Sequence, residues 1–326
     1  MPMNNSILLF RPDHIGDFLL TTPAIHALKS SFPDIPLVLA AGDWVVPLVR
    51  GNPYISEVMP INLPWMERYS KPNWYRMIRE IREIRDRQFP VVINFRKALK
   101  ENLISIFTGI SVRYGFNVTK SAWVHTHLAP YNLSKHIAEN YLDLVEAYGA
   151  QRYSGGLEIF LTEEERTTPL QKYNLHEPYI VIAPGSGFSP KLWVNERWYL
   201  LVDWLQSFKT WNIVLTGSLK ESAFNEQIAA GQSLPVLNLA GKVTLRELTA
   251  IISGAVLLIT VDSAAMHIGS AMRTPLVALF GPTDPQQWGP YPADLSAVVV
   301  SKPQMMEITL RDVQDAVEEI LSKISK

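Results

Sequence analysis

Short apolar runs alternate along this chain with longer segments in which apolar residues recur every three or four positions. The run Ser6–Phe10 is typical of a buried strand, and the segment Asn73–Arg87 is typical of a helix with one apolar face. The alternation continues through the whole chain, so it predicts βαβ units with parallel strands. We expect strands at 6–10, 37–41, 57–60, 91–95, 179–183, 213–216, 256–260 and 276–280, and helices at 24–31, 73–87, 137–148, 196–207, 245–253, 264–271 and 310–324.

The pattern occurs twice, on either side of a polar stretch at residues 162–178. With 326 residues, the chain is about twice as long as a usual domain. We therefore expect an α/β protein of two domains, residues 1–165 and 166–326, each with a parallel sheet. Open parallel sheets bind ligands beyond the carboxyl ends of their strands, so two such domains imply a cleft between them. The terminal helix 310–324 has no evident partner in the sequence, and packing back onto the N-terminal domain is one arrangement open to it.

The composition narrows the range of functions. The chain is 47% hydrophobic and 19% charged, which is typical of a packed globular protein, and its net charge of -1 gives no reason to expect a nucleic-acid partner. The absence of cysteine excludes disulfides, thiolate metal sites and cysteine nucleophiles. The first ten residues do not resemble a signal peptide, and no apolar stretch approaches the roughly 20 residues needed to span a bilayer. We expect a cytoplasmic protein that touches a membrane only peripherally.

The first stretch with candidate chemistry is RPDHIGD, residues 11–17, directly after the first expected strand. Gly16 allows a sharp turn or a close approach to a ligand. Asp17 is a candidate general base, because a carboxylate beyond the end of a strand could accept a proton from a substrate hydroxyl. The alternative is that Asp17 only caps the following helix. Asp13 is a second candidate in the same loop, and His14 fits a loop histidine better than a base.

Two further stretches follow strands in the second half of the chain. In PGSGFSPK, residues 184–191, Ser186 and Gly187 could present hydroxyl and N–H groups to phosphate, and Lys191 could supply a positive charge. The alternative is an ordinary glycine turn with a surface lysine, since neither a dinucleotide fingerprint nor a Walker A loop is present. Further on, Glu221 could accept hydrogen bonds from a ribose or a base. Its alternative role is that of an acid favoured in the first turn of a helix.

The fourth stretch, TVDSAAMHIG at residues 260–269, joins an expected strand to a helix that begins with small residues. Small side chains such as Ala264 leave the N–H groups of that helix start open to an anion. Asp262 and Ser263 lie at the junction, and His267 lies about one turn further, where it could point towards a bound phosphate. The alternatives are a helix cap for Asp262 or Ser263 and a core histidine for His267.

A basic and aromatic segment extends over residues 65–87. It could face an anionic acceptor or lipid headgroups. The acidic residues interleaved with the basic ones favour the alternative, a solvated helix face. The basic residues are Arg68, Lys71, Arg76, Arg79, Arg82, Arg85 and Arg87.

Taken together, these stretches resemble glycosyltransferase family 9, the bacterial ADP-heptose:lipopolysaccharide heptosyltransferases. The pieces that carry the resemblance are RPDHIGDFLLTTPAIHALK, PGSGFSPKLW, VLTGS with Glu221, LNLAGKVTLREL and VDSAAMHIGSAMRTPLVALFGPTDP. The resemblance implies a GT-B fold of two Rossmann-like domains facing a cleft, with the acceptor on the first domain and the nucleotide sugar on the second. It also implies inverting, metal-independent transfer of a heptose or related sugar, with ADP-heptose as the donor, to a lipopolysaccharide core or other surface glycan, without a cofactor.

The resemblance extends to individual residues. It implies that Asp17 is the catalytic base, that Lys191 contacts the donor phosphates and that Glu221 holds the nucleoside. Asp262, Ser263 and His267 match the donor-site motif at the helix start, while the sequence before Lys191, Phe188-Ser189-Pro190, departs from the commoner form. Without a metal, the leaving diphosphate would be stabilised by the lysine, the histidine and helix N–H groups.

Two other functions fit the same fold. One is a nucleotide-sugar epimerase, which would need no acceptor. The other is a nucleotide-sugar-binding protein without catalytic activity. A nicotinamide dehydrogenase is disfavoured, because the glycine fingerprint is missing.

Overall fold

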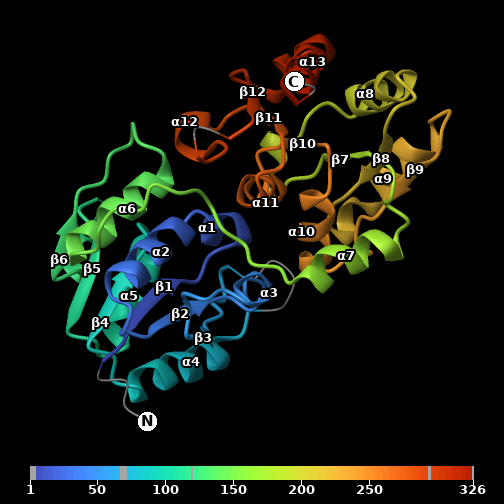
Figure 1. Cartoon of the computed structure of the whole chain (residues 1–326). Helices are drawn as coiled ribbons and strands as arrows, with labels where there is room; N and C mark the ends of the chain where they lie inside the picture. Colours follow the sequence, from blue (N-terminus) through green and yellow to red (C-terminus); the bar gives the residue numbers. More distant parts are fainter. Residues whose placement is uncertain (1–4, 67–71, 119, 293–294, 325–326) are drawn as a thin grey trace. The chain divides into compact units, whose positions relative to one another are not determined.

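The protein is described here from a computed structural model, which describes residues 5–66, 72–118, 120–292 and 295–324. The chain forms two compact units, residues 1–160 and 161–326, where we expected the boundary at 165/166 (Figure 1). Each unit is described by itself. Both are α/β, as expected, and each contains a six-stranded sheet. Arg68 and Lys71 of the basic segment lie outside the described residues.

The first unit is a parallel sheet covered by helices on both faces. Its elements are β1 (Ile7–Arg11), α1 (Ile15–Leu19), α2 (Thr22–Ser31), β2 (Leu37–Ala41), α3 (Val46–Val49), β3 (Glu57–Pro60), α4 (Trp74–Asp86), β4 (Val91–Asn94), α5 (Leu99–Phe107), β5 (Val112–Phe116), η1 (Ala122–Val124), β6 (His127–Ala129) and α6 (Ile137–Tyr148). The strand order is β3-β2-β1-β4-β5-β6. Leu8 and Phe10 of β1 face a core that contains Ile81 of α4 and Ile104 of α5. Because side chains alternate along a strand, the residues between them point to the other face, where α2 and α6 pack together.

The second unit repeats this architecture. Its elements are α7 (Glu163–Lys172), β7 (Tyr179–Ala183), η2 (Ser189–Lys191), α8 (Asn195–Ser207), β8 (Asn212–Leu215), η3 (Leu219–Glu221), α9 (Ser222–Ala230), β9 (Val236–Asn238), α10 (Leu245–Ser253), β10 (Leu257–Val261), α11 (Ala264–Met272), β11 (Leu276–Phe280), α12 (Pro285–Trp288), β12 (Ala297–Ser301), η4 (Met305–Glu307) and α13 (Leu310–Ile324). The strand order is β12-β11-β10-β7-β8-β9, and every strand pair is parallel.

The terminal helix α13 belongs to the core of the second unit. Its apolar stripe, which includes Val313, Val317 and Ile320, is buried in the same cluster as Trp193 and Trp198. The helix packs on β11, β12 and α8. The apolar face of α13 is therefore buried within the second unit.

In both sheets the strand order reverses between two central strands. The reversal falls between β1 and β4 in the first unit and between β7 and β10 in the second. Loops that leave such a pair of strands diverge to opposite faces of the sheet, which opens a crevice where α/β proteins bind ligands. The loops after β1, β4, β7 and β10 are therefore the places where a site is expected. No helix among the described residues is long and apolar enough to cross a bilayer.

Candidate functional site

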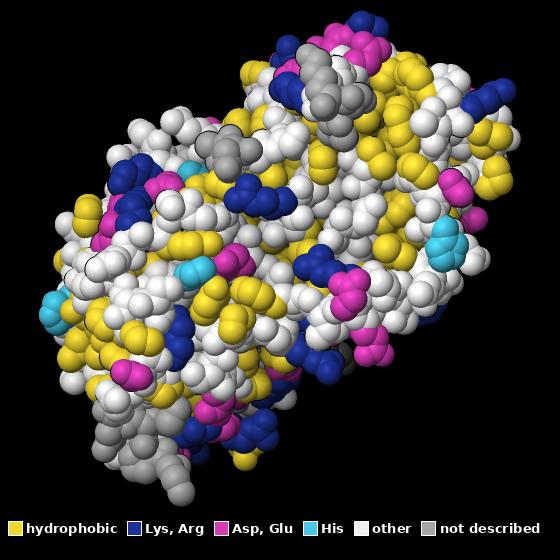
Figure 2. Space-filling view, in the orientation of Figure 1, with side chains coloured by type: hydrophobic (Ala, Val, Ile, Leu, Met, Phe, Trp, Pro, Cys, Tyr) yellow, Lys and Arg dark blue, Asp and Glu magenta, His cyan; other side chains and the backbone are white. Residues whose placement is uncertain are grey.

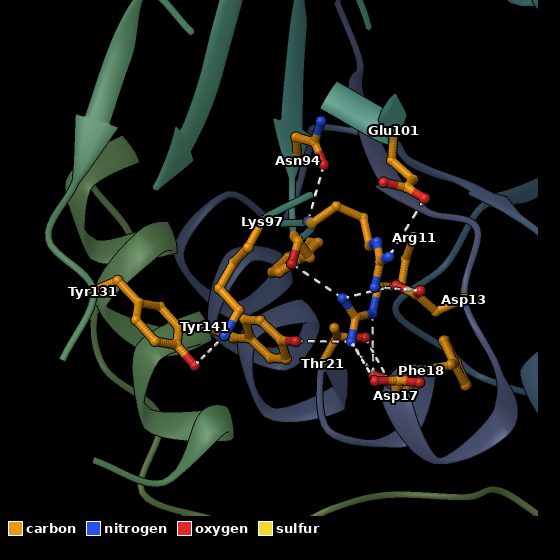
Figure 3. A network of polar contacts seen from close by, with 12 residues as sticks. Arg11, Asp13, Asp17, Phe18, Thr21, Asn94, Lys97, Glu101, Tyr131 and Tyr141 are labelled. Atoms are coloured by element: carbon orange, nitrogen blue, oxygen red, sulfur yellow. Dashed lines mark hydrogen bonds and ion pairs between the residues drawn. The ribbon is translucent and has the colours of Figure 1, made fainter. Parts of the chain in front are cut away.

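Asp17 lies in the first turn of α1, just beyond the carboxyl end of β1. The N-cap of α1 is His14, so the alternative that Asp17 caps this helix is wrong. The Asp17 side chain is 26% exposed. One carboxylate oxygen, Oδ1, lies 3.4 Å from the Arg11 guanidinium, and no hydrogen bond to the other, Oδ2, is present among the described residues (Figure 3). A partly exposed carboxylate with one open oxygen can accept a proton from a bound hydroxyl.

Asp13 occupies a different environment in the same loop. Its buried carboxylate lies 3.0 Å from Arg11 and 2.6 Å from Arg96, which follows β4. Burial raises the pKa of Asp13 to about 6, and the positive charges of Arg11 and Arg96 oppose this rise. With both oxygens paired with arginines in the interior, the Asp13 carboxylate is less accessible to a substrate than that of Asp17.

The remaining loop residues shape the surroundings of Asp17. The backbone carbonyl of Asp13 accepts a hydrogen bond from the Trp44 indole at 2.7 Å, and the His14 ring lies 5.9 Å from that of Trp44. His14 is thus a loop histidine beside an aromatic residue, as expected. Gly16 lies inside α1, between Ile15 and Asp17.

Residues that the sequence analysis did not single out complete the site on the first unit. Lys97, in the loop after β4, donates a hydrogen bond to the Tyr131 hydroxyl at 2.7 Å. Burial lowers the pKa of Lys97, and the neighbouring charges of Arg11 and Arg96 lower it further. Arg96 and Lys97 follow a strand, so the rule that identified Asp17 could have identified them. Tyr141 also belongs to the site, because its hydroxyl accepts a hydrogen bond from Arg11 at 2.7 Å. It lies within α6, and helical periodicity alone would have identified it only as a core residue.

On the second unit, Lys191 and Asp262 meet across the reversal of strand order. Lys191 follows β7, Asp262 follows β10, and Lys191 Nζ lies 2.5 Å from Asp262 Oδ2. The hydroxyl of Thr283, in the loop after β11, donates to the same oxygen at 2.7 Å. The surface-lysine alternative is therefore wrong, because Lys191 forms an ion pair with a buried carboxylate.

The start of α11 has the geometry expected of an anion site. Ser263 is the N-cap residue, but its side chain makes no capping hydrogen bond and instead lies 3.1 Å from the Thr260 hydroxyl. The first N–H groups of the helix, beginning at Ala264, therefore have no side-chain cap, and such groups favour a negatively charged ligand. His267 is buried, with 4% of its surface exposed, one turn into the same helix.

Glu221 is held against two glycines at the ends of neighbouring strands. Its carboxylate accepts a hydrogen bond from the backbone N–H of Ser218 at 2.5 Å, so the helix-start role is confirmed. The same carboxylate lies against Gly185 and Gly217, where an added Cβ would come within 1.8 Å and 2.7 Å of its oxygens. A side chain at either position would displace the Glu221 carboxylate from its present place.

The loop after β7 also contains Ser186 and Gly187. The Ser186 hydroxyl accepts a hydrogen bond from the backbone N–H of Phe188 at 3.3 Å, and Gly187 is exposed. The second unit thus presents a lysine, an uncapped helix start and glycine-lined loops at one edge of its sheet. Among the described residues, no three His, Asp or Glu side chains form a group that could hold a metal ion.

Comparisons with known proteins agree with this geometry. The sequence model of "Glycosyltransferase family 9 (heptosyltransferase)" matches residues 77–317. The chain is 31% identical over 289 residues to lipopolysaccharide heptosyltransferase 3 of Escherichia coli strain K12. The aligned region covers 85% of this chain and 82% of that protein.

Solved structures show the same fold. A glycosyl transferase family 9 protein from Veillonella parvula DSM 2008 superposes with a TM-score of 0.83 at 22% identity, over 99% of both chains. E. coli heptosyltransferase WaaC, solved with ADP-2-deoxy-2-fluoro heptose, gives a TM-score of 0.76 at 18% identity, over 96% of this chain and 99% of that one. The GT-B class of fold expected from the sequence is confirmed.

Proposed function

The chain belongs to glycosyltransferase family 9, the heptosyltransferases, and on that premise we propose that it transfers a heptose from ADP-heptose to a hydroxyl group of a lipopolysaccharide core. The name of the E. coli relative supports the sugar and the acceptor. The donor analogue in the WaaC structure supports the nucleotide. The side chains beyond the carboxyl ends of the two sheets support separate binding sites, with the acceptor hydroxyl at Asp17 and the donor diphosphate at the start of α11.

In the proposed reaction, Asp17 removes the proton of the acceptor hydroxyl as its oxygen attacks the anomeric carbon of the heptose. The bond from that carbon to the diphosphate oxygen breaks, and ADP leaves with the bonding electrons. A single in-line displacement of this kind inverts the anomeric configuration. The observation that carries the proposal is the state of the Asp17 carboxylate, since one oxygen is held by Arg11 and the other is open.

The leaving diphosphate needs compensation for its developing charge. We assign this role to Lys191, to His267 and to the N–H groups at the start of α11, with Ser186 and Gly187 lining the phosphate loop. Glu221 is assigned to the ribose or base of the nucleoside, and Asp262 holds Lys191 in place through their ion pair. These groups supply the stabilisation without a metal ion, so the reaction is expected to run at full rate in excess chelator.

The decisive test is Asp17→Asn, measured with ADP-heptose and a lipopolysaccharide core acceptor. A general base contributes about 100- to 10,000-fold to rate, so kcat should fall by at least about 100-fold. The stabilisation of the variant by ADP-heptose in a thermal melt should match that of the wild type, because the donor binds elsewhere. Asp34→Asn, which changes an exposed aspartate of the same unit, serves as the control and should leave kcat unchanged. Transfer at the wild-type rate by Asp17→Asn would contradict the mechanism.

Incubation of the enzyme with ADP-heptose alone separates this proposal from its two rivals. A transferase leaves the sugar unchanged until the acceptor is added. An epimerase would convert the sugar without an acceptor, and a binding protein would release no ADP under either condition. The anomeric configuration of the product, read by NMR, tests inversion, and strict dependence on added Mg²⁺ or Mn²⁺ would count against a metal-independent reaction.

We further propose that α4 touches the cytoplasmic face of a membrane that holds the acceptor. Its outer face carries Trp74 and Tyr75, which are 57% and 77% exposed. Arg79, Arg82 and Arg85 lie on the same exposed side and form no ion pair with described residues. Figure 2 shows basic side chains at the lower edge of the first unit, where Figure 1 places α4. Aromatic and basic side chains on one helix face suit an anionic lipid surface.

Vesicle sedimentation tests this contact. With vesicles that contain phosphatidylglycerol, the double change Arg79→Ala and Arg82→Ala should lower the bound fraction, since each basic residue near such a surface contributes about 1 kcal/mol. The matched control, Arg311→Ala with Lys323→Ala, removes two exposed cations of α13 and should leave binding unchanged. Equal binding by both variants would contradict the assignment to α4.

A further inference from the structure

Arg11, the last residue of β1, has a guanidinium group buried within the site of the first unit (Figure 3). It donates hydrogen bonds to the backbone carbonyl of Asp17 twice, from Nε at 3.1 Å and from Nη2 at 3.0 Å. Nη1 donates to the Phe95 carbonyl at the end of β4, and Nη2 donates to the Tyr141 hydroxyl on α6, at 3.0 Å and 2.7 Å. One side chain thereby connects the β1–α1 loop, the end of β4 and α6.

The fold alone gives no reason for this charge to be buried. Replacing a buried ion pair by apolar residues of similar size is often neutral or stabilising, so such a pair is weak evidence for a role in stability. Burial opposes the charge of Arg11, but Tyr141, Asp13 and Asp17 outweigh burial and raise the pKa of Arg11 above its usual value. Arg11 therefore stays cationic at every pH at which the protein is folded.

The contacts of Arg11 with its two carboxylate neighbours differ in kind. With Asp13, Arg11 forms a buried ion pair at 3.0 Å. With Asp17, the two short hydrogen bonds go to the backbone carbonyl, and the carboxylate is approached only at 3.4 Å. The rigid fork of a guanidinium fixes the backbone of Asp17 in this way. The Asp17 side chain is oriented by its backbone but keeps an oxygen for the substrate.

We propose that Arg11 is a positioning residue for the base Asp17, and this inference rests on the proposed function. Arg11 holds the main chain of Asp17 and thereby fixes the position of its carboxylate. Asp13 compensates most of the charge, so that Arg11 orients Asp17 without capturing it. Tyr141 holds the guanidinium in place by accepting a hydrogen bond from Nη2.

The test compares three variants of this network in the full-length enzyme. Arg11→Lys keeps the charge and loses the fork, Arg11→Met loses both, and Tyr141→Phe removes one hydroxyl that contacts Arg11. Misplacement of a catalytic group by about 1 Å can cost about 100-fold, so kcat should fall by roughly 10- to 100-fold in both Arg11 variants, with the KM for ADP-heptose unchanged. Tyr141→Phe should reduce kcat by about threefold.

Arg113→Met is the matched control. Arg113 is another part-buried arginine of the same unit, and within the described part of the chain its guanidinium donates to the backbone carbonyls of Val124 and Ile110 at 2.7 Å and of Ser111 at 3.2 Å. Its loss should lower the melting temperature without moving kcat per folded enzyme or the pH–rate profile.

Two results would overturn the inference. One is a wild-type kcat in both Arg11→Lys and Tyr141→Phe. The other is a loss of activity in all three variants that is fully explained by a smaller fraction of folded enzyme. Failure of the inference is distinguishable from failure of the proposed function. In the first case Asp17→Asn stays inactive while Arg11→Lys is fully active, and in the second Asp17→Asn itself transfers the sugar.

Discussion

The two units share one sheet topology but place different chemistry where their strand order reverses. At the β1/β4 reversal, the charged side chains of Arg11, Asp13 and Glu101 are buried, and the first two pair with each other at 3.0 Å. At the β7/β10 reversal, the ion pair Lys191–Asp262 lies among hydroxyls, glycines and a helix start without a side-chain cap. A fold determines where a site lies but not which residues form it. In this chain, two sheets of the same topology place a site at the same position and carry different residues there.

The difference suggests what each edge is built to do. At the β1/β4 reversal, Arg11 and Arg96 are already paired with Asp13, so these charged groups are positioned before a substrate binds. In the second unit, under the proposed function, Lys191 would exchange its contact with Asp262 for an incoming phosphate, and the N–H groups at the start of α11 would bind the same anion. This difference is what the proposed function requires, with proton transfer at a fixed position in the first unit and binding and release of a diphosphate in the second.

The largest effect that would sharpen this comparison is expected for Lys191→Gln. A hydrogen bond to a charged group contributes about 1.5 to 3 kcal/mol, so the affinity for ADP should fall by roughly 10- to 100-fold. Isothermal titration calorimetry measures this loss, and the pH–rate profile set by the first unit should keep its shape. Lys209→Gln, which removes an exposed lysine before β8, is the control and should bind ADP normally. If Lys191→Gln binds ADP as tightly as the wild type, the second edge does not capture the diphosphate through this lysine.

A smaller effect is expected for Gly185→Ala. The new Cβ would lie within 1.8 Å of a Glu221 oxygen, so the carboxylate must move away from the end of β7. Loss of one hydrogen-bonding contact to the nucleoside should weaken ADP binding by about tenfold. In the background of Glu221→Ala, the same substitution should cost little, because nothing remains to be displaced. Gly231→Ala is the control, since its Cβ would meet no atom closer than 3.7 Å. If Gly185→Ala lowers the affinity for ADP equally in the presence and absence of the Glu221 carboxylate, the effect of the alanine does not act through Glu221.

The central strands of both sheets were predictable because they are buried on both faces. Such strands appear as unbroken apolar runs, as in β1 and β7, whose residues are all buried. Four edge and near-edge strands, β5, β6, β9 and β12, were not predicted, for the converse reason, whereas the edge strand β3 was. In β5, the first residues are only partly buried and include Arg113, and β6 exposes His127 and Leu128. A partly exposed strand carries polar residues and loses the apolar signal on which the prediction depends.

The site was predictable to the extent that its residues follow strands. Asp17, Lys191 and Asp262 all lie at such positions, and the structure brings Lys191 and Asp262 together. The role of Arg11 was not predictable, because it depends on Tyr141, which is 130 positions away in the sequence. The packing of α6 brings these two residues together, and no local sequence pattern predicts a contact between residues so far apart.

The smallest effect concerns pH and tests whether buried ionisable groups make the first unit the pH-sensitive one. Burial, with the nearby charge of Arg113, lowers the pKa of His125 from 6.5 to about 4. Below pH 6.5 the unfolded chain therefore takes up a proton that the folded unit refuses, so stability falls as the pH falls towards 4. From pH 7.5 to 6.0, this histidine should lower the protection of the β5 amides against hydrogen exchange by about fourfold, after correction for intrinsic rates.

His125→Leu should remove that part of the pH dependence, and His127→Leu, at a neighbouring exposed histidine, should not. Asp13 changes the stability in the opposite direction. Its pKa is raised to about 6, so the folded unit holds a proton more tightly than the unfolded chain does. The contribution of His125 is therefore measured as the difference between variant and wild type. The amides of β7 and β10 provide the internal reference. If their protection falls with pH as steeply as that of β5, and His125→Leu changes neither, the contrast in pH sensitivity between the two units is wrong.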